Sequence, residues 1–403
     1  MELFWLEHKK LWRKKIVKIC VLLCFVYCVI FGSILSFQWF CFGSSDDYIS
    51  AFGNNFDGYT VIKDSQEYAL SFGGELTDET LQKIVSDYQQ MEADGMGEEL
   101  EKTDWQIVNS WLGTLYPELR DTSNYKTMIS YVDPDKLTGF YERRQQVLDE
   151  FLEVSGQVGA EKEFLHQIER KVEKPFRYEW VEGWSMLLGS MVADLGVVMA
   201  LFLGIVLSSL FAGEWHDNTS TLVLTTRNGW GKIALAKILT GLAFTVELFA
   251  LLAVSNVISQ LFFMGTAGWD MPIQNIKLIA VAPMNMLQAE IYEYAFVLLG
   301  AIGFAGIVMF ISAAVKNNVL TLLLSLAVVY GPMMIAEYLP YEMQKALDLI
   351  PLVGSSTDIF RTNTFRIFGK LIWSPYLLIT IPVLIGILCM PFAIKSWSRR
   401  MKA

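Results

Sequence analysis

Long apolar runs and polar segments alternate along this chain, and their lengths predict a membrane protein. A hydrocarbon core about 30 Å thick is crossed by roughly 20 apolar residues of α-helix. Runs of that kind predict six spanning helices, over residues 17–40, 184–211, 238–264, 292–315, 318–339 and 373–394. The expected fold is an all-α polytopic membrane protein with a mainly helical (α+β) domain, 41–183, inserted after the first helix. The other five helices would form a transmembrane domain over 184–394.

Local signals predict the elements of the inserted domain. Thr103 with Gln106 is a capping-box pattern before an apolar helix, and Asp133 followed by Pro134 favours the start of a helix that runs through Phe151. The β-branched and aromatic residues of 59–72 indicate one or two strands. Two weaker signals predict a helix over about 160–173 and a turn at Gly95 and Gly97.

Charge separates the two parts of the chain. Overall, 53% of the residues are hydrophobic and 18% are charged, against about 25% in soluble proteins. Segment 41–182 holds 29 acidic and 13 basic residues, a net charge of −16, and the rest of the chain has a net charge of +6. Because phosphate binding needs positive charge, the acidic segment argues against nucleic acid as a partner. No cysteine lies within 42–182, so an internal disulfide is excluded there.

Lysine and arginine in the short loops predict the orientation. One face collects 14 of them: six in the N-terminal segment 9–18, four in the tail 395–403, and Arg227, Lys232, Lys237 and Lys316. The short loops of the opposite face hold five. Both termini are therefore expected in the cytoplasm and segment 41–183 outside, in a bacterial cytoplasmic membrane.

The loop expected at 212–237, between the second and third spans, carries the most informative short pattern. Phe211 and Glu214 come first, then a Thr/Leu-rich stretch, and then basic residues. Taken by its residue types, the loop is either a solvated connection with cytoplasmic lysines or a short amphipathic surface helix that a partner could push. The positions that carry the pattern are Phe211, Glu214, Leu222, Leu224, Thr225, Thr226, Arg227, Gly229, Lys232 and Lys237.

This order resembles the loop of ABC transporter permeases of the ABC-2 type. The basic, amphipathic elbow at 1–16 and the large insertion after the first span are similar to that family too. The resemblance implies a dimer of identical or paralogous permeases, each docked to a separate ATP-binding subunit that holds ATP and Mg²⁺. It implies an outer re-entrant segment at 340–372, which the residues alone would also allow to be an interfacial loop. The positions that it makes ATPase-facing are Glu214, Thr225, Arg227, Gly229 and Lys232.

Nucleotide chemistry is not expected within this chain. A P-loop needs Gly-Lys followed by Ser or Thr. Gly231-Lys232 is followed by Ile233, and Gly369-Lys370 by Leu371. With no catalytic or metal-binding pattern either, the sequence predicts a protein that is not an enzyme and has no cofactor of its own.

Acidic and small residues inside the spans give further candidates. Asp194 and Glu247 are candidates for a translocation path or an interhelical contact, or for protonated or hydrogen-bonded packing groups. Glu293 and Glu337 lie near span ends and are expected to reach the interface. Small residues permit close helix contact, within one chain or across a dimer. These are Gly300, Ala301, Gly303, Ala305 and Gly306.

Together, these features favour a permease that exports a hydrophobic or amphipathic substrate, such as a peptide antibiotic, a lipid or a drug. The alternative is an ATPase-driven sensor or mechanotransmitter that acts through the external domain without moving cargo.

Overall fold

Helices dominate the structure, a computed structural model that describes residues 2–42, 58–95, 105–121, 126–188, 192–217, 219, 231–354 and 363–399. Within these residues, five helices are long and apolar enough to cross a membrane. They are α10 (Val192–His216), α12 (Lys232–Met264), α13 (Met286–Val315), α14 (Asn318–Ile335) and α16 (Ser374–Arg399). The chain is therefore a multi-pass membrane protein.

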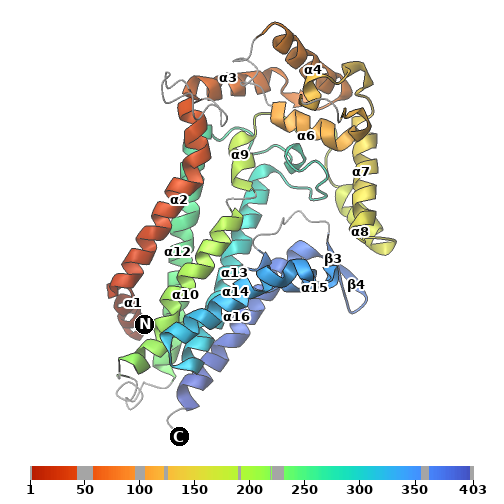
Figure 1. Ribbon diagram of the computed structural model, residues 1–403. Helices are drawn as coiled ribbons and strands as arrows, with labels where there is room; N and C mark the ends of the chain where they lie inside the picture. Colours follow the sequence, from red (N-terminus) through yellow and green to blue (C-terminus); the bar gives the residue numbers. More distant parts are fainter. Residues whose placement is uncertain are drawn as a thin grey trace.

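Two further helices precede this bundle. α1 (Glu2–Arg13) is short, and α2 (Lys15–Phe42) covers the first expected span and packs along α12. The side chains of 31–42 lie outside the described part, so the crossing of the membrane by α2 stays a prediction. Figure 1 shows α1 and the end of α16 at one end of the bundle, with α3, α4 and α6 at the other.

The helices extend beyond the apolar runs that predicted them. α10 reaches His216, and α12 begins at Lys232 instead of residue 238. The connection between them is therefore 217–231, shorter than the expected loop 212–237, and Glu214, Lys232 and Lys237 lie on helices. An apolar run marks the length that lipid surrounds, whereas Lys and Glu are good helix formers that carry a helix into the polar region.

The second expected span is also divided. A short helix, α9 (Glu182–Met186), comes first, and α10 starts at Val192. α13 starts at Met286, six residues before the expected 292, because Asn285 and Gln288 form a capping box. The sequence therefore located the membrane segments but not the ends of their helices.

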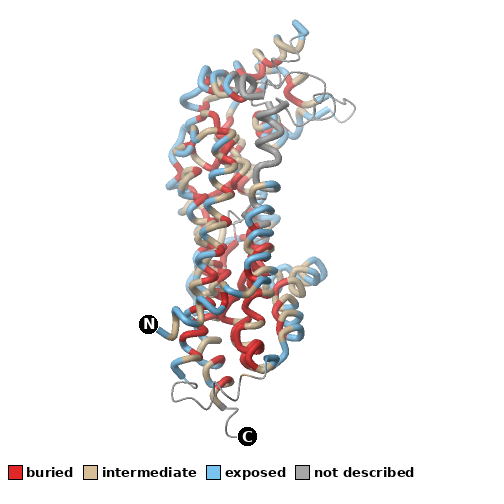
Figure 2. The backbone as a smooth tube through the Cα atoms, turned by 90° about the vertical axis from the view of Figure 1, so that its left-hand side faces the viewer, coloured by how far each residue is buried: buried red, intermediate tan, exposed pale blue. Residues whose placement is uncertain are grey.

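Small residues bring α13 and α16 into backbone contact. A Cβ on Gly303 would strike the Pro382 carbonyl, and one on Gly306 would lie 2.5 Å from the Gly386 carbonyl oxygen. Gly300 packs on Leu352. Of the two readings of these small residues, packing within the chain is confirmed. Figure 2 shows that the buried residues follow the inside of the bundle, with exposed residues on its outer faces.

The inserted domain is built from α3 (Gly58–Ser71), α4 (Asp78–Ala93), α6 (Trp105–Leu115), α7 (Phe140–Val154) and α8 (Ala160–Glu169). Short 3-10 turns, Pro117–Leu119, Met128–Ser130 and Pro134–Lys136, connect them. Its sheet is one antiparallel pair, β1 (Gly74–Glu75) with β2 (Arg177–Tyr178). The domain core contains Trp111, Phe140, Phe176 and Tyr178, whose rings meet edge to face.

Some local predictions for this domain hold and others are wrong. α6 begins at Trp105 as expected, although its cap Thr103 lies outside the described residues, and Gly95 forms the expected turn after α4, with φ +75°. Segment 59–72 is helix α3 instead of strands. Ile62, Gln66 and Ala69 fall on one helical face, and the two apolar ones pack with Trp180 and Met264. This tertiary contact overrides the local β preference.

The helix expected from Asp133 also begins later. Asp133 caps only the short turn Pro134–Lys136. α7 starts at Phe140, after Gly139 with φ +70°, a conformation that glycine adopts readily. α8 lies within the expected helix of 160–173 but ends at Glu169.

The connection from α12 to α13, residues 265–285, folds together with the inserted domain. It contains a 3-10 turn, Ile273–Asn275. Leu278 belongs to the domain core, and Met271 and Ile273 pack in a second cluster with Leu148 and Leu165 of α7 and α8. The inserted domain is thus assembled from two stretches of sequence, of which only the first was predicted.

Segment 340–372 forms α15 (Tyr341–Leu347) and a β-hairpin, β3 (Thr364–Ile367) with β4 (Lys370–Trp373). Figure 1 shows both at the level where α14 ends and α16 begins, below the external domain. The hairpin was not foreseen from the sequence.

Candidate functional site

An ionic cluster with Glu214 and Lys237 buried at its centre lies where α1 meets the end of α10 and the start of α12. We call Glu7, Lys10, Lys14, Glu214 and Lys237 the junction cluster. The Lys237 ammonium lies 2.8 Å from carboxylate oxygens of both Glu214 and Glu7, and the Lys10 ammonium lies 2.5 Å from Glu214. The cluster therefore ties three helices together at both ends of the connection 217–231.

Glu214 is the centre of this cluster. Its side chain is 3% exposed, and besides the two lysines it accepts a hydrogen bond from the Thr219 hydroxyl at 2.5 Å. Every one of these partners comes from the chain itself. The sequence predicted an ATPase-facing role for Glu214, and the structure places it inside the joint that holds the loop ends.

Charge inside the cluster is nearly balanced, with three lysines against two glutamates. Burial opposes the charged form of Lys10, but the hydrogen bond and the charge of Glu214 outweigh it and raise the Lys10 pKa. Burial lowers the pKa of Lys14, and the charges of Lys237 and Lys10 lower it further. Lys14 donates to the Ser209 hydroxyl at 2.9 Å. The cavity among these groups is about 20 Å³, room for a water molecule and not for a nucleotide.

Glu247, expected in a translocation path or an interhelical contact, meets the same N-terminal helix. The Trp12 indole donates to its carboxylate at 3.1 Å, and His8 lies 3.2 Å away. Trp12 also packs edge to face on Phe244. The contacts observed for Glu247 are thus between α12 and α1.

The other predicted residues are spread more widely. Lys232 is exposed at the first position of α12. Thr225, Arg227 and Gly229 lie outside the described residues. Asp194 lies on α10, with a side chain outside the described part.

Other helices also hold the end of α10. The Ser312 hydroxyl of α13 donates to the Ser208 carbonyl at 2.7 Å. Trp397 of α16 packs against Phe211 and Trp215, and the Lys316 ammonium lies 4.3 Å from the Trp215 ring centroid. A displacement of the α10 end would therefore reach α1, α12, α13 and α16.

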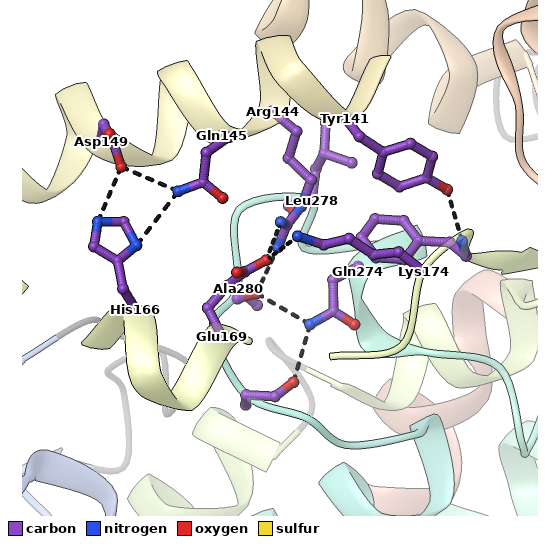
Figure 3. A network of polar contacts seen from close by, with 12 residues as sticks. Tyr141, Arg144, Gln145, Asp149, His166, Glu169, Lys174, Gln274, Leu278 and Ala280 are labelled. Carbon is purple, nitrogen blue, oxygen red and sulfur yellow. Dashed lines mark hydrogen bonds and ion pairs between the residues drawn. The ribbon is translucent and has the colours of Figure 1, made fainter. Parts of the chain in front are cut away.

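A second polar network, at the opposite end of the molecule, joins the inserted domain to the 265–285 connection (Figure 3). The fully buried Arg144 guanidinium of α7 donates to the carbonyls of Leu278 at 2.7 Å and Ala280 at 3.1 Å. It also pairs with Glu169 of α8 at 2.6 Å, and Glu169 binds Lys174 at 2.8 Å. Buried charges are retained where they are paired and hydrogen-bonded, so this network fixes the connection to the domain.

A cavity lies beside the contact between this domain and the 265–285 connection. This cavity of about 520 Å³ is bounded by Gln106 and Ser110 of α6, Phe151 of α7, Glu182 of α9 and Lys277 of the connection. Its volume is within the range of small-molecule sites. No group of three or more His, Cys, Asp or Glu within the described residues is arranged to hold a metal ion.

Sequence reasoning missed two features of the candidate sites. Arg144 and the 265–285 connection carry no local signal, because their contact joins positions more than a hundred residues apart. α13 also buries Glu290 and Glu293, which are about 4–5% exposed. The expectation that Glu293 reaches the interface is therefore wrong, because its side chain faces other protein segments.

Comparison of the chain with models of protein families, with curated proteins and with solved structures finds no match.

Proposed function

We propose that this chain is the permease subunit of an ABC exporter of the ABC-2 type, which carries a hydrophobic or amphipathic substrate across the cytoplasmic membrane. A separate ATP-binding subunit would bind ATP and Mg²⁺, and a second permease copy or paralogue would complete the transporter. Both termini and the connection 217–231 would face the cytoplasm.

The junction cluster is the observation that carries the proposal. It joins the two ends of the connection 217–231 to α1 through ion pairs of 2.5–2.8 Å, in which Glu214 and Lys237 are buried and Lys10 is half exposed. A partner that pushes on this connection would move α1, α10 and α12 together, because breaking a buried ion pair is costly. In this mechanism Glu214 transmits the force, while Arg227 and Lys232 contact the ATPase.

The test is ATP hydrolysis by the complex purified from native membranes through a tag on this chain. The double variant Arg227→Glu with Lys232→Glu is expected to lose the co-purifying ATP hydrolysis, because it reverses two charges at the docking surface. Arg170→Glu with Lys171→Glu makes the same charge change on the exposed surface of the external domain and should leave the activity intact. Full activity in the Arg227 and Lys232 variant would exclude this docking surface.

A second candidate function, force transmission without transport, has its own support. α12 has 33 residues, a length of about 50 Å. It carries Lys237 of the junction cluster near its start and ends at Met264, whose carbonyl accepts a hydrogen bond from Gln66 of α3. Such a continuous helix would also suit a lever that works the external domain. Reconstitution of the complex in sealed vesicles separates the two functions, because ATP-dependent movement of a substrate occurs only in the exporter.

A further inference from the structure

The tip of the β3–β4 hairpin presents a phenylalanine that is fully exposed. Phe368 has 103% of its reference accessible area, and it is followed by Gly369. Ile367 pairs with Lys370 across the hairpin, so Phe368 and Gly369 are the two residues of the turn. Their φ angles are +49° and +79°. Two positive φ values are the pattern of a type I′ turn, which joins tightly paired strands.

Phenylalanine is a poor residue for this position in water. A type I′ turn favours Asn-Gly, because a bulky side chain at positive φ is sterically strained. Full exposure of the ring also leaves its apolar surface in water, which is less favourable than burial. Both costs would be avoided by asparagine, so the ring points to a contact outside the chain.

The position of the hairpin indicates what that contact is. β4 ends at Trp373, and α16, a candidate membrane span, begins at the next residue. A strand of four residues is about 13 Å long, so the tip lies within that distance of the end of the span. Aromatic residues surround this level: Tyr376 is exposed beside Trp373, with ring centroids 5.9 Å apart, and Tyr338 is exposed after α14. Exposed Trp and Tyr near span ends mark the interface between membrane and water.

The base of the hairpin is held while its tip is free of the fold. The Thr364 hydroxyl donates to the Gln157 side chain at 2.7 Å, and Arg366 pairs with Glu161 of α8 at 2.6 Å. These contacts attach the hairpin to the external domain. At the tip, Phe368 and Lys370 are exposed, and a lysine ammonium beside an aromatic ring suits a phosphate headgroup.

We propose that the β3–β4 hairpin is a membrane anchor, in which Phe368 inserts into the bilayer leaflet nearest the external domain and Lys370 meets the phosphates. Through Glu161 and Gln157 the anchor holds α7 and α8 at a fixed height over the lipid. This inference needs only that α16 crosses the membrane, and it is independent of the proposed transport function.

The experiment uses the full-length chain with its five cysteines replaced, in phosphatidylcholine–phosphatidylglycerol nanodiscs. Phe368→Cys and Lys370→Cys are each labelled with an environment-sensitive nitrobenzoxadiazole dye. The Lys370 variant keeps Phe368 in place. Val154, the last residue of α7, is 88% exposed, and Val154→Cys is the control for a water-exposed site. Lipids that carry a nitroxide in the acyl chain or in the headgroup then quench the dye by contact.

Anchoring predicts a blue-shifted emission at position 368 that acyl-chain nitroxides quench. At position 370 headgroup nitroxides should quench the dye more strongly than acyl-chain nitroxides. At position 154 neither nitroxide should quench it. Emission at 368 and 370 that matches the 154 control would overturn the proposal. A blue-shifted emission at position 368 that appears only when a nanodisc holds two copies of the chain would also overturn the proposal, because the ring would then contact a second copy instead of lipid.

Discussion

Glu214 shows how much the role of one residue depends on its partners. Its buried carboxylate pairs with two lysines, of which Lys237 is buried and Lys10 is half exposed. Lys237 is as deeply buried and has only Glu7 besides Glu214 as an acidic partner in the contacts described. Removal of the central charge would therefore leave a cation with incomplete compensation.

Glu214→Gln is expected to destabilise the protein by about 3 kcal/mol, because the buried Lys237 charge then keeps Glu7 as its acidic partner in the contacts described and loses its second one. The measurement is thermal unfolding in nanodiscs, followed by tryptophan fluorescence. Addition of Lys237→Met should recover most of the loss, since the buried cation is then removed as well. Asp217→Asn is the matched control, because Asp217 is exposed and its ion pair among the described residues is with His216 on the surface. Equal stability of the Glu214 and Asp217 variants would contradict the assignment.

At the scale of the elements, the contact between α13 and α16 rests on glycines that face backbone atoms. The facing atoms are backbone carbonyls of a packed helix, and they cannot move aside for a new Cβ as the end of a flexible side chain could.

Gly306→Ala should therefore cost about 1–3 kcal/mol through overpacking. Gly331→Ala on α14 has no atom within 4 Å of the new Cβ and is expected to be neutral or slightly stabilising, because alanine favours helix. Unfolding midpoints of the two variants in the same nanodiscs give the comparison. A neutral Gly306 variant would mean that α13 and α16 separate easily.

The joint between α7 and α8 should respond to acid. Burial raises the pKa of Glu169, but its bonds with Lys174 and Arg144 outweigh burial and lower it below the ordinary 4.5. A lowered carboxyl pKa means that this contribution to stability is complete above the unfolded-state pKa and is lost as the pH falls through the folded-state value.

We expect the external domain to loosen as the pH falls below about 4.5, and Glu169→Gln to remove that part of the pH dependence. Glu163→Gln, an exposed glutamate on the same helix, is the control. Hydrogen exchange of residues 274–282 against pH measures the effect. An unchanged pH profile in the Glu169 variant would show that another group controls the joint.

At the scale of the molecule, the arrangement of the bundle makes sidedness testable. Figure 1 places the chain ends and the external domain at opposite ends of the long helices. In a cysteine-free background, Val154→Cys should react with a membrane-impermeant maleimide in intact cells. Lys232→Cys and Lys395→Cys should react only after permeabilisation. Labelling of either lysine position in intact cells would refute the expected orientation.

Local pattern was sufficient for the membrane part of the fold. Five of the six expected spans overlap helices of spanning length, and α2 covers the remaining expected span, 17–40. This follows because lipid leaves the backbone no partner except itself, so an apolar run of sufficient length becomes a helix wherever it lies. Charge asymmetry and the acidic insertion could likewise be read from the sequence.

The joints between segments were decided by the tertiary structure. Lys10 and Glu214 are 204 positions apart, and Arg144 meets carbonyls more than 130 positions away. α3 is a helix because its apolar face meets Trp180 and Met264. Such contacts depend on how distant segments pack, for which neighbouring residues carry no signal. The sequence by itself therefore determined which segments enter the membrane, and only the tertiary structure determined which charges meet and which elements are joined.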